Sequence, residues 1–229
     1  MSQGRGVLFL LLLLVASGWA QAQTTSRTQP HAPAPRPTAA DSEPWEYNLT
    51  VDGYIIEGED GYASPTFAAD RNWLHLEARY NYENFRTGSL WAGYNFSWGK
   101  NWQFEVTPMI GGVFGRTNGI APGCEASVGW KIVTLSIDNE YVFDTTSKSG
   151  NFYYSWPQLT FEPVSWFRFG GVAQRSKVFQ TAFDTQRGFF VGFHKKLGPD
   201  HKQKAEFTTY VFDPGSNSTT VTLELGYSF

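Results

Sequence analysis

The sequence predicts an all-β protein, an antiparallel up-and-down transmembrane β-barrel with 12 strands preferred and ten as the alternative. Two observations lead to this fold class. From Trp45 to Phe229 apolar and polar residues alternate with a period of two, which is the pattern of β-strands. The alternating segments run for about ten residues, the length that a tilted strand needs to cross a bilayer. No helical periodicity with capping residues follows residue 45.

The two faces of the predicted strands differ in charge. In one segment Leu74 and Leu76 share a face, whereas His75, Glu77 and Arg79 lie on the opposite one. The apolar faces assigned in this way contain no Asp, Glu, Lys or Arg. A charge that faces lipid costs about 2–4 kcal/mol at the bilayer midplane, so a membrane barrel requires this absence. The polar faces are also rich in Gly, Ser and Thr, which suits a narrow lumen filled by side chains.

Aromatic residues are frequent near the ends of these strands. The residues concerned are Tyr80, Tyr82, Trp98, Trp102, Trp130, Tyr141, Trp166 and Tyr227. Tyr and Trp at strand ends are typical of the girdles at membrane interfaces. The alternative is that they fill the core of an ordinary soluble β-sandwich.

The N-terminal residues are expected to lie outside the barrel domain, which spans 45–229. Residues 1–22 have the pattern of a secretory signal peptide, with Arg5, an apolar run over 7–15 and a small-residue cleavage site over 20–22. An uncleaved anchor is the alternative, but a spanning helix needs about 20 residues. Residues 23–44 contain five prolines, which prevent a regular helix or strand, and are expected to form an extended periplasmic linker.

The C-terminal segment Val221–Phe229 places apolar residues at alternating positions and ends on an aromatic residue. This segment resembles the terminal strand of bacterial outer-membrane β-barrel proteins of Gram-negative cells. The resemblance implies that Tyr227 and Phe229 form a signal read by the barrel-assembly machinery. It also implies a place in the outer membrane, in contact with its lipids. The rest of the chain points to no specific characterised family.

The expected strands are 46–56, 62–69, 73–83, 87–98, 101–114, 123–132, 134–144, 151–162, 166–178, 187–196, 204–213 and 219–229. Pro65 interrupts the second of them. If 46–69 forms a periplasmic segment or a plug instead, ten strands remain. An even number places both termini on the periplasmic side. Short turns would then face the periplasm, at 70–72, 99–100, 133 and 163–165 with a longer one at 197–203, and longer loops would face outward, at 115–122, 145–150, 179–186 and 214–218.

The inward faces supply the candidate site residues. They are the lumen-lining polar side chains His75, Glu77, Arg79, Glu105, Glu125, Lys131, Asp138, Glu140, Arg168, His194, Glu206 and Glu224. An unpaired buried charge is strongly unfavourable, so we expect these groups to pair with one another across the lumen.

The leading functional interpretation is a porin-like barrel with a charged polar lumen, which is either structural or a narrow passive channel for small solutes. The first alternative is an outer-membrane enzyme that modifies lipid or lipopolysaccharide, with His75 or His194 as the base and Glu77 orienting His75. This alternative is less favoured because the nucleophile motif G-x-S-x-G is absent. The second alternative is a secreted soluble β-barrel that binds a ligand.

The composition of the chain argues against several classes of binding partner and cofactor. The net charge of -3 argues against nucleic acid as a partner. The single cysteine, Cys124, excludes an internal disulfide and a cysteine-based metal site. The scattered histidines and carboxylates match no metal-binding motif, so we expect neither a metal nor another cofactor. The oligomeric state stays open.

Overall fold

The computed structural model describes residues 44–56, 60–178, 181–199, 202–216 and 219–229. The signal peptide expected at 1–22 and the linker expected at 23–44, apart from its last residue, lie outside these ranges. No helix in the described ranges is long and apolar enough to cross a membrane.

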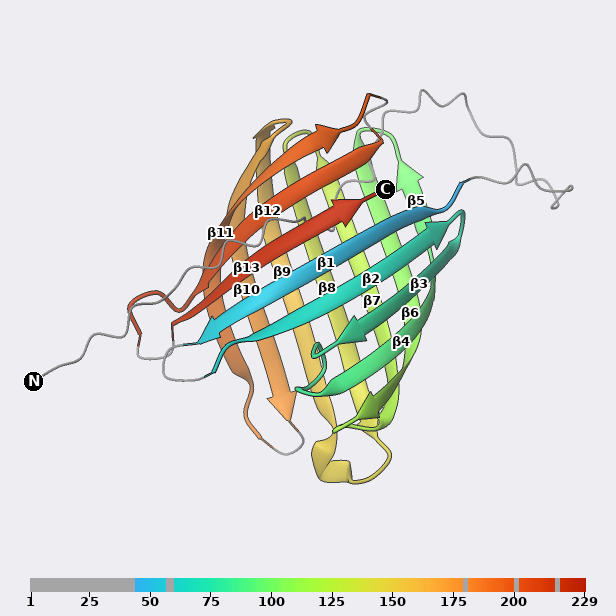
Figure 1. The fold of residues 1–229 in the computed structure, drawn as a ribbon, viewed down its shortest axis with the longest axis vertical. Helices are drawn as coiled ribbons and strands as arrows, with labels where there is room; N and C mark the ends of the chain where they lie inside the picture. Colours follow the sequence, from blue (N-terminus) through green and yellow to red (C-terminus); the bar gives the residue numbers. More distant parts are fainter. Residues whose placement is uncertain (1–43, 57–59, 179–180, 200–201, 217–218) are drawn as a thin grey trace, which may run out of the picture.

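The chain forms one closed antiparallel sheet (Figure 1). Its strands are β1 (Glu46–Ile56), β2 (Tyr62–Arg71), β3 (Leu74–Tyr80), β4 (Thr87–Tyr94), β5 (Phe96–Gly99), β6 (Trp102–Gly115), β7 (Gly119–Trp130), β8 (Val133–Asp144), β9 (Phe152–Val164), β10 (Phe167–Val178), β11 (Asp184–Leu197), β12 (Gln203–Phe212) and β13 (Thr220–Ser228). The 3-10 helix η1 (Lys148–Gly150) lies in the loop between β8 and β9. Apart from β4 and β5, strands that follow one another pair, β1 pairs with β13, and the pairing of β4 with β6 completes the ring.

The barrel has 12 strands because β4 and β5 are two parts of one strand. Both pair with β6, and the register continues without a shift from Gly93 opposite Met109 to Phe96 opposite Val106. Asn95 alone separates the two parts. The preferred prediction of 12 strands is therefore confirmed, and the alternative of ten is wrong.

The expected strand 62–69, which Pro65 interrupts, is a complete strand of the barrel, β2. Pro65 lies within β2 opposite Val51, and the register between β1 and β2 passes through it without interruption. The pairing of β2 with β3 begins only at Thr66, opposite Arg79. The N–H that Pro65 lacks is therefore not required by that neighbouring ladder, which explains why a proline is tolerated inside a closed sheet.

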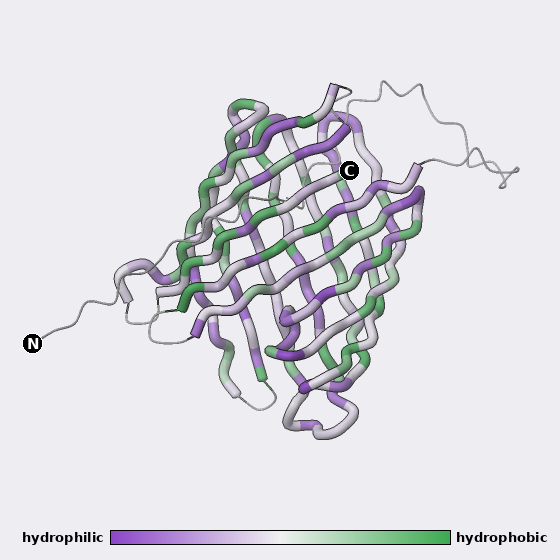
Figure 2. The backbone as a smooth tube through the Cα atoms, in the orientation of Figure 1, coloured by the Kyte–Doolittle hydropathy of each residue, from purple (hydrophilic) through white to green (hydrophobic). Residues whose placement is uncertain are grey.

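The barrel is polar inside and apolar outside. Among the described residues, 22 buried residues are polar or charged and 11 are hydrophobic, the reverse of a soluble core. Leu90 and Ile110 on the outer face are each 59% exposed, whereas Thr208 and Thr222 inside are fully buried. Hydrophilic and hydrophobic residues alternate along the strands in Figure 2. This inversion confirms the predicted faces and is the arrangement of a membrane barrel.

Tyr82 departs from the predicted faces. The alternation placed it outside, but β3 ends at Tyr80 and Asn81 adopts a positive φ of 59°, which turns the following side chain inward. The Tyr82 ring packs at 4.5 Å from the Arg79 guanidinium carbon and edge-on to Tyr154, with ring centroids 5.7 Å apart. The outward assignment of Tyr82 was wrong.

The two rims of the barrel differ. One, the turn rim, has two-residue turns at 72–73, 100–101, 131–132 and 165–166, while the other, the loop rim, carries the longer segments, including 145–151 with η1 (Figure 1). The expected loop 115–122 is shorter, because β6 extends to Gly115 and β7 begins at Gly119. The predicted contrast between short turns and longer loops is present.

Both ends of the barrel domain meet at the turn rim. Tyr47 N donates to Phe229 O at 2.9 Å, and Phe229 N donates to Tyr47 O at 3.0 Å. The Phe229 ring is 48% exposed and lies between Tyr47 and Tyr227, at 5.3 Å from each ring. Further stacked pairs follow the same rim, among them Trp102 with Trp130 at 5.6 Å. Stacked rings at strand ends form the kind of belt that the sequence predicted.

Candidate functional site

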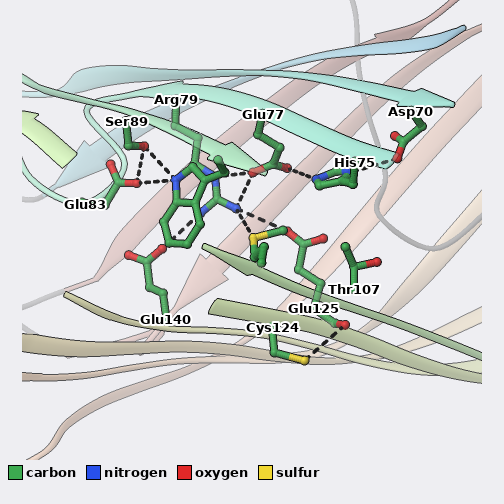
Figure 3. A network of polar contacts seen from close by, with 12 residues as sticks. Asp70, His75, Glu77, Arg79, Glu83, Ser89, Thr107, Cys124, Glu125 and Glu140 are labelled. Atoms are coloured by element: carbon green, nitrogen blue, oxygen red, sulfur yellow. Dashed lines mark hydrogen bonds and ion pairs between the residues drawn. The ribbon is translucent and has the colours of Figure 1, made fainter. Parts of the chain in front are cut away.

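Arg79 of β3 is the centre of the first of two charged networks in the lumen. Its guanidinium contacts Glu77 of the same strand, Glu125 of β7 at 3.3 Å and Glu140 of β8 at 3.1 Å. All four residues are buried, and their side chains lie close together in Figure 3. A guanidinium withdrawn from water is stabilised only by such charge-assisted hydrogen bonds, and here three strands supply them.

Aromatic rings hold the Arg79 guanidinium from two sides. Its central carbon lies 4.5 Å from the ring centre of Tyr82 and 4.7 Å from that of Trp91. Trp91 is fixed in turn, since its Nε1 donates to Ser89 Oγ at 2.9 Å and Ser89 Oγ donates to Glu83 at 2.5 Å. The arginine is therefore rigidly positioned across the lumen, with cation–π contacts added to its ion pairs.

His75 extends the first network toward the turn rim. Its Nδ1 lies 2.8 Å from Asp70 Oδ1, and its Nε2 lies 3.4 Å from Glu77 Oε1. Asp70 Oδ1 also accepts from Asn95 Nδ2 at 2.7 Å, and Asn95 Oδ1 accepts from Thr107 at 2.7 Å. The histidine ring is thus fixed by a chain of hydrogen bonds that crosses from β2 to β6.

Arg168 of β10 is the centre of the second network. It pairs with Glu206 of β12 at 2.5 Å and Glu224 of β13 at 3.1 Å. Lys204 contacts Glu206 at 2.8 Å, and Tyr210 donates to Glu224 at 3.0 Å. The network joins strands on the opposite side of the barrel from Arg79.

His194 of β11 lies beside this second network. Its Nε2 is 3.6 Å from Glu162 Oε1 on β9. Both histidines that the enzyme interpretation used thus lie against carboxylates, those of Asp70 and Glu77 for His75 and that of Glu162, two strands away, for His194.

A narrow cavity of about 70 Å³ lies between the two networks. Its lining is Thr50, Asp52, Tyr54, Thr66, Glu77, Arg79, Tyr82, Glu125, Ser136, Asp138, Tyr154, Trp156, Gln158, Arg168, Tyr210 and Glu224. Five of these residues are carboxylic acids and two are arginines, so the formal charge of the lining is negative. A buried water needs roughly 10–15 Å³, so the space suits a short file of waters or a small ion.

Apolar side chains narrow the lumen toward the loop rim. One buried cluster contains Trp91, Met109, Val113, Ala121 and Val142, and another contains Val172, Phe190, Tyr210 and Phe212. Most of these inward-facing residues lie in the loop-rim halves of their strands, while Val172 and Phe190 lie near the middle of theirs. The lumen therefore changes from a charged middle to an apolar, aromatic section.

The structure brings most of the sequence-predicted site residues together. Those that line the cavity are Glu77, Arg79, Glu125, Asp138, Arg168 and Glu224, while His75, Glu140, His194 and Glu206 are buried beside it. Glu105 is half-buried and accepts from Ser127 Oγ at 3.3 Å.

Lys131 does not lie in the lumen. It occupies the two-residue turn between β7 and β8 with a φ of 55°, is exposed, and places Nζ 4.5 Å from the ring centre of Trp130. The alternation of β7 ends at Trp130, and continuing it by one residue assigned Lys131 to the wrong face.

Several charged residues of the two networks and of the cavity lining were missed by the sequence prediction. They are Asp52, Asp70, Glu83, Glu162 and Lys204. Asp52 lies within the expected strand 46–56 as it does within β1, but it was not counted among the lumen residues because an Asp-Gly pair is typical of turns or bulges. Asp70 was assigned to a turn one residue past the expected strand. Glu83, Glu162 and Lys204 are end residues of the expected strands 73–83, 151–162 and 204–213, so applying the period of two up to the last residue of each strand would have found them.

Known proteins share this fold at low sequence identity. No protein-family model and no curated protein matches the sequence. Among solved structures, the KdgM porin in complex with disordered oligogalacturonate is similar with a TM-score of 0.52 and 9% identity, over 80% of this chain and 98% of that one. The NanC porin is similar with a TM-score of 0.50 and 12% identity, over 79% and 98%. At this identity the likeness shows the fold alone, and the chain has the fold of a small outer-membrane porin.

Proposed function

We propose that the protein is a narrow passive channel for small solutes in the outer membrane, and that it favours cations over anions. The observation that carries this function is the excess of carboxylic acids over arginines around the cavity between the two networks. Export by the expected signal peptide and insertion by the barrel-assembly machinery belong to the same proposal.

Carboxylates in a narrow pore select for cations, because they replace part of the hydration of a cation and repel anions. The low dielectric of the surrounding lumen strengthens this discrimination relative to bulk water. Asp52 and Asp138 line the cavity, and neither forms an ion pair with Arg79 or Arg168 within the described residues. Their charges are therefore the least compensated of the lining and should contribute most to selectivity.

The similar KdgM porin was solved in complex with oligogalacturonate, which is a polyanion. A lumen with a net negative lining repels such a solute, and its cavity is far smaller than the roughly 300–1,000 Å³ of sites that hold larger ligands. We therefore infer that small cations and small neutral solutes are preferred to acidic oligosaccharides.

Planar bilayer recordings test this function. The chain, purified from membranes, is inserted in a bilayer with a KCl gradient, and the reversal potential is measured. We expect a small unitary conductance with a reversal potential on the potassium side. An absence of conductance would instead support a purely structural barrel, and a reversal potential on the chloride side would contradict the proposed selectivity.

A pair of variants locates the selectivity in the lumen. The double substitution Asp52→Asn and Asp138→Asn removes two uncompensated charges, so the reversal potential should move toward zero. The control is Glu46→Gln, which removes one charge at an exposed residue at the start of β1. Equal reversal potentials for the double variant and the unmodified chain would contradict a conduction path through this cavity.

A further inference from the structure

Three buried side chains converge on one point of the lumen beside Arg79. One potential ligand atom from each of His75, Glu77 and Glu125 lies within 4.8 Å of the other two. The residues are 3%, 4% and 6% exposed, so all three are withdrawn from solvent. They come from β3 and β7, which the barrel brings to the same stretch of lumen (Figure 3).

The hydrogen bonds of His75 orient its ring for ligation. A carboxylate can only accept, so Nδ1 carries the hydrogen in the 2.8 Å contact with Asp70. This leaves Nε2 directed toward Glu77. Histidines that bind metals through one nitrogen commonly donate the other N–H to a carboxylate in this way. Asn95 holds that carboxylate in place at 2.7 Å.

Only one of the two carboxylate oxygens of Glu125 has a hydrogen-bond donor among the described residues. Its Oε1 accepts from Arg79 at 3.3 Å, while its buried Oε2 has no hydrogen-bond donor among the described residues. A buried carboxylate oxygen without a donor is costly, and a cation at this point would remove the cost. The same cation would meet Glu77 and the Nε2 lone pair of His75.

We propose that His75, Glu77 and Glu125 bind a divalent transition-metal cation in the lumen. One imidazole nitrogen and two carboxylate oxygens form a donor set that suits Zn²⁺ and similar borderline ions. Tetrahedral ligands of one such ion lie about 3.3–3.6 Å apart, since each bond is about 2.0–2.2 Å, so side chains whose ligand atoms lie within 4.8 Å of one another need to close by about 1 Å at most. Three protein ligands leave a further position for water or a solute oxygen.

The surrounding charges can accommodate a divalent ion. Asp70, Glu77, Glu125 and Glu140 supply four negative charges around Arg79 and the ion, which together carry three positive charges. Arg79 keeps its contacts, because it uses the other oxygen of Glu77 and of Glu125. The site does not rest on the channel function, since it would bind metal equally in a closed lumen.

Calorimetric titration with Zn²⁺ tests the site. The full chain, purified from membranes without a polyhistidine tag and folded in detergent, should bind one ion. Glu125→Gln and His75→Gln should each weaken binding by at least about tenfold, and Asp70→Asn by about 10–100-fold through loss of the histidine's orientation. Glu105→Gln and His194→Gln, which change the same groups elsewhere in the lumen, should bind as the unmodified chain does.

A spectroscopic measurement on the unmodified chain does not depend on the folding of variants. The rival state is a protonated His75 that bridges Asp70 and Glu77 without a metal. Nitrogen-15 chemical shifts distinguish an imidazolium from a neutral, metal-bound ring, and we expect zinc to produce the latter at His75. An unchanged His75 signal, an absence of zinc binding, or equal weakening by the control variants would each overturn the proposal.

Discussion

At the scale of single residues, glycines on the inward face make room for the large side chains of the lumen. A Cβ on Gly192 would lie 2.8 Å from Nε of Arg168 and 2.9 Å from Oγ1 of Thr208. A Cβ on Gly111 would lie 2.4 Å from the indole of Trp91. The absence of a side chain at these positions is therefore what allows the arginine and the tryptophan to cross the lumen.

Replacing Gly192 with valine should destabilise the barrel. The added methyl groups would displace Arg168 from Glu206, and overpacking of this kind costs about 1–3 kcal/mol. Gly171→Val is the matched control on the neighbouring strand, since its nearest atom beyond the chain neighbours would be 4.0 Å away and it faces outward. The free energy of unfolding in lipid vesicles, from urea titration, checks both. Equal losses for the two variants would contradict the packing described here.

The same scale explains which site residues the sequence could identify. Glu77, Arg79 and Glu125 follow from alternation alone, because a period of two fixes the face of every residue inside a strand. Tyr82 and Lys131 were assigned to the wrong face because alternation stops where a non-glycine residue adopts a positive φ, at Asn81 and at Lys131 itself. Periodicity carries no signal for such a residue.

At the scale of the strand, β8 offers a direct test of the two faces. Ile137 faces outward near the middle of the strand, and its neighbour Ser136 lines the cavity beside Asp138. Ile137→Arg should reduce the free energy of unfolding in vesicles by about 2–4 kcal/mol, because the charge enters hydrocarbon. Ser136→Arg should cost less, because carboxylates face it. If the two variants were equally stable, the assigned faces would be wrong.

The terminal strand β13 allows assembly to be separated from stability. The exposed Phe229 ring contacts Tyr47, a ring pair that contributes about 0.5–1.5 kcal/mol. If Phe229 also carries the assembly signal, Phe229→Ala should lower the amount of folded barrel in cell outer membranes several-fold while the purified chain still refolds in detergent. Tyr47→Ala removes the same ring contact and should leave the cellular amount nearly unchanged. Equal cellular amounts for both variants would remove the support for a signal at Phe229.

The strands and their order in the ring were largely predictable, and the contacts of their side chains across the lumen were not. Alternation located all 12 strands, including β2 with its proline, to within a few residues at most ends. The partners of Arg79 come from β3, β7 and β8, and those of Arg168 from β12 and β13. Which inward carboxylate reaches which arginine depends on the tilt and stagger of the closed sheet, and a single strand contains no information about either.

At the scale of the whole molecule, ion pairs and hydrogen bonds take the place of a hydrophobic core. The apolar residues that would fill a soluble interior lie on the outer face, where hydrocarbon solvates them. The interior holds two arginine-centred networks joined to strands on both sides of the cavity. Because residues of these networks also line the cavity, we expect changes to them to alter both stability and the proposed selectivity.

The junction of β1 with β13 has a consequence for biogenesis. These strands are the farthest apart along the chain, yet nine residues of each pair in register. Until β13 has been synthesised, the backbone N–H and C=O groups on that edge of β1 have no hydrogen-bond partner, and hydrocarbon cannot supply one. A polypeptide that ends before β13 therefore cannot close the barrel, so only copies that carry the last strand can form the complete sheet within the lipid.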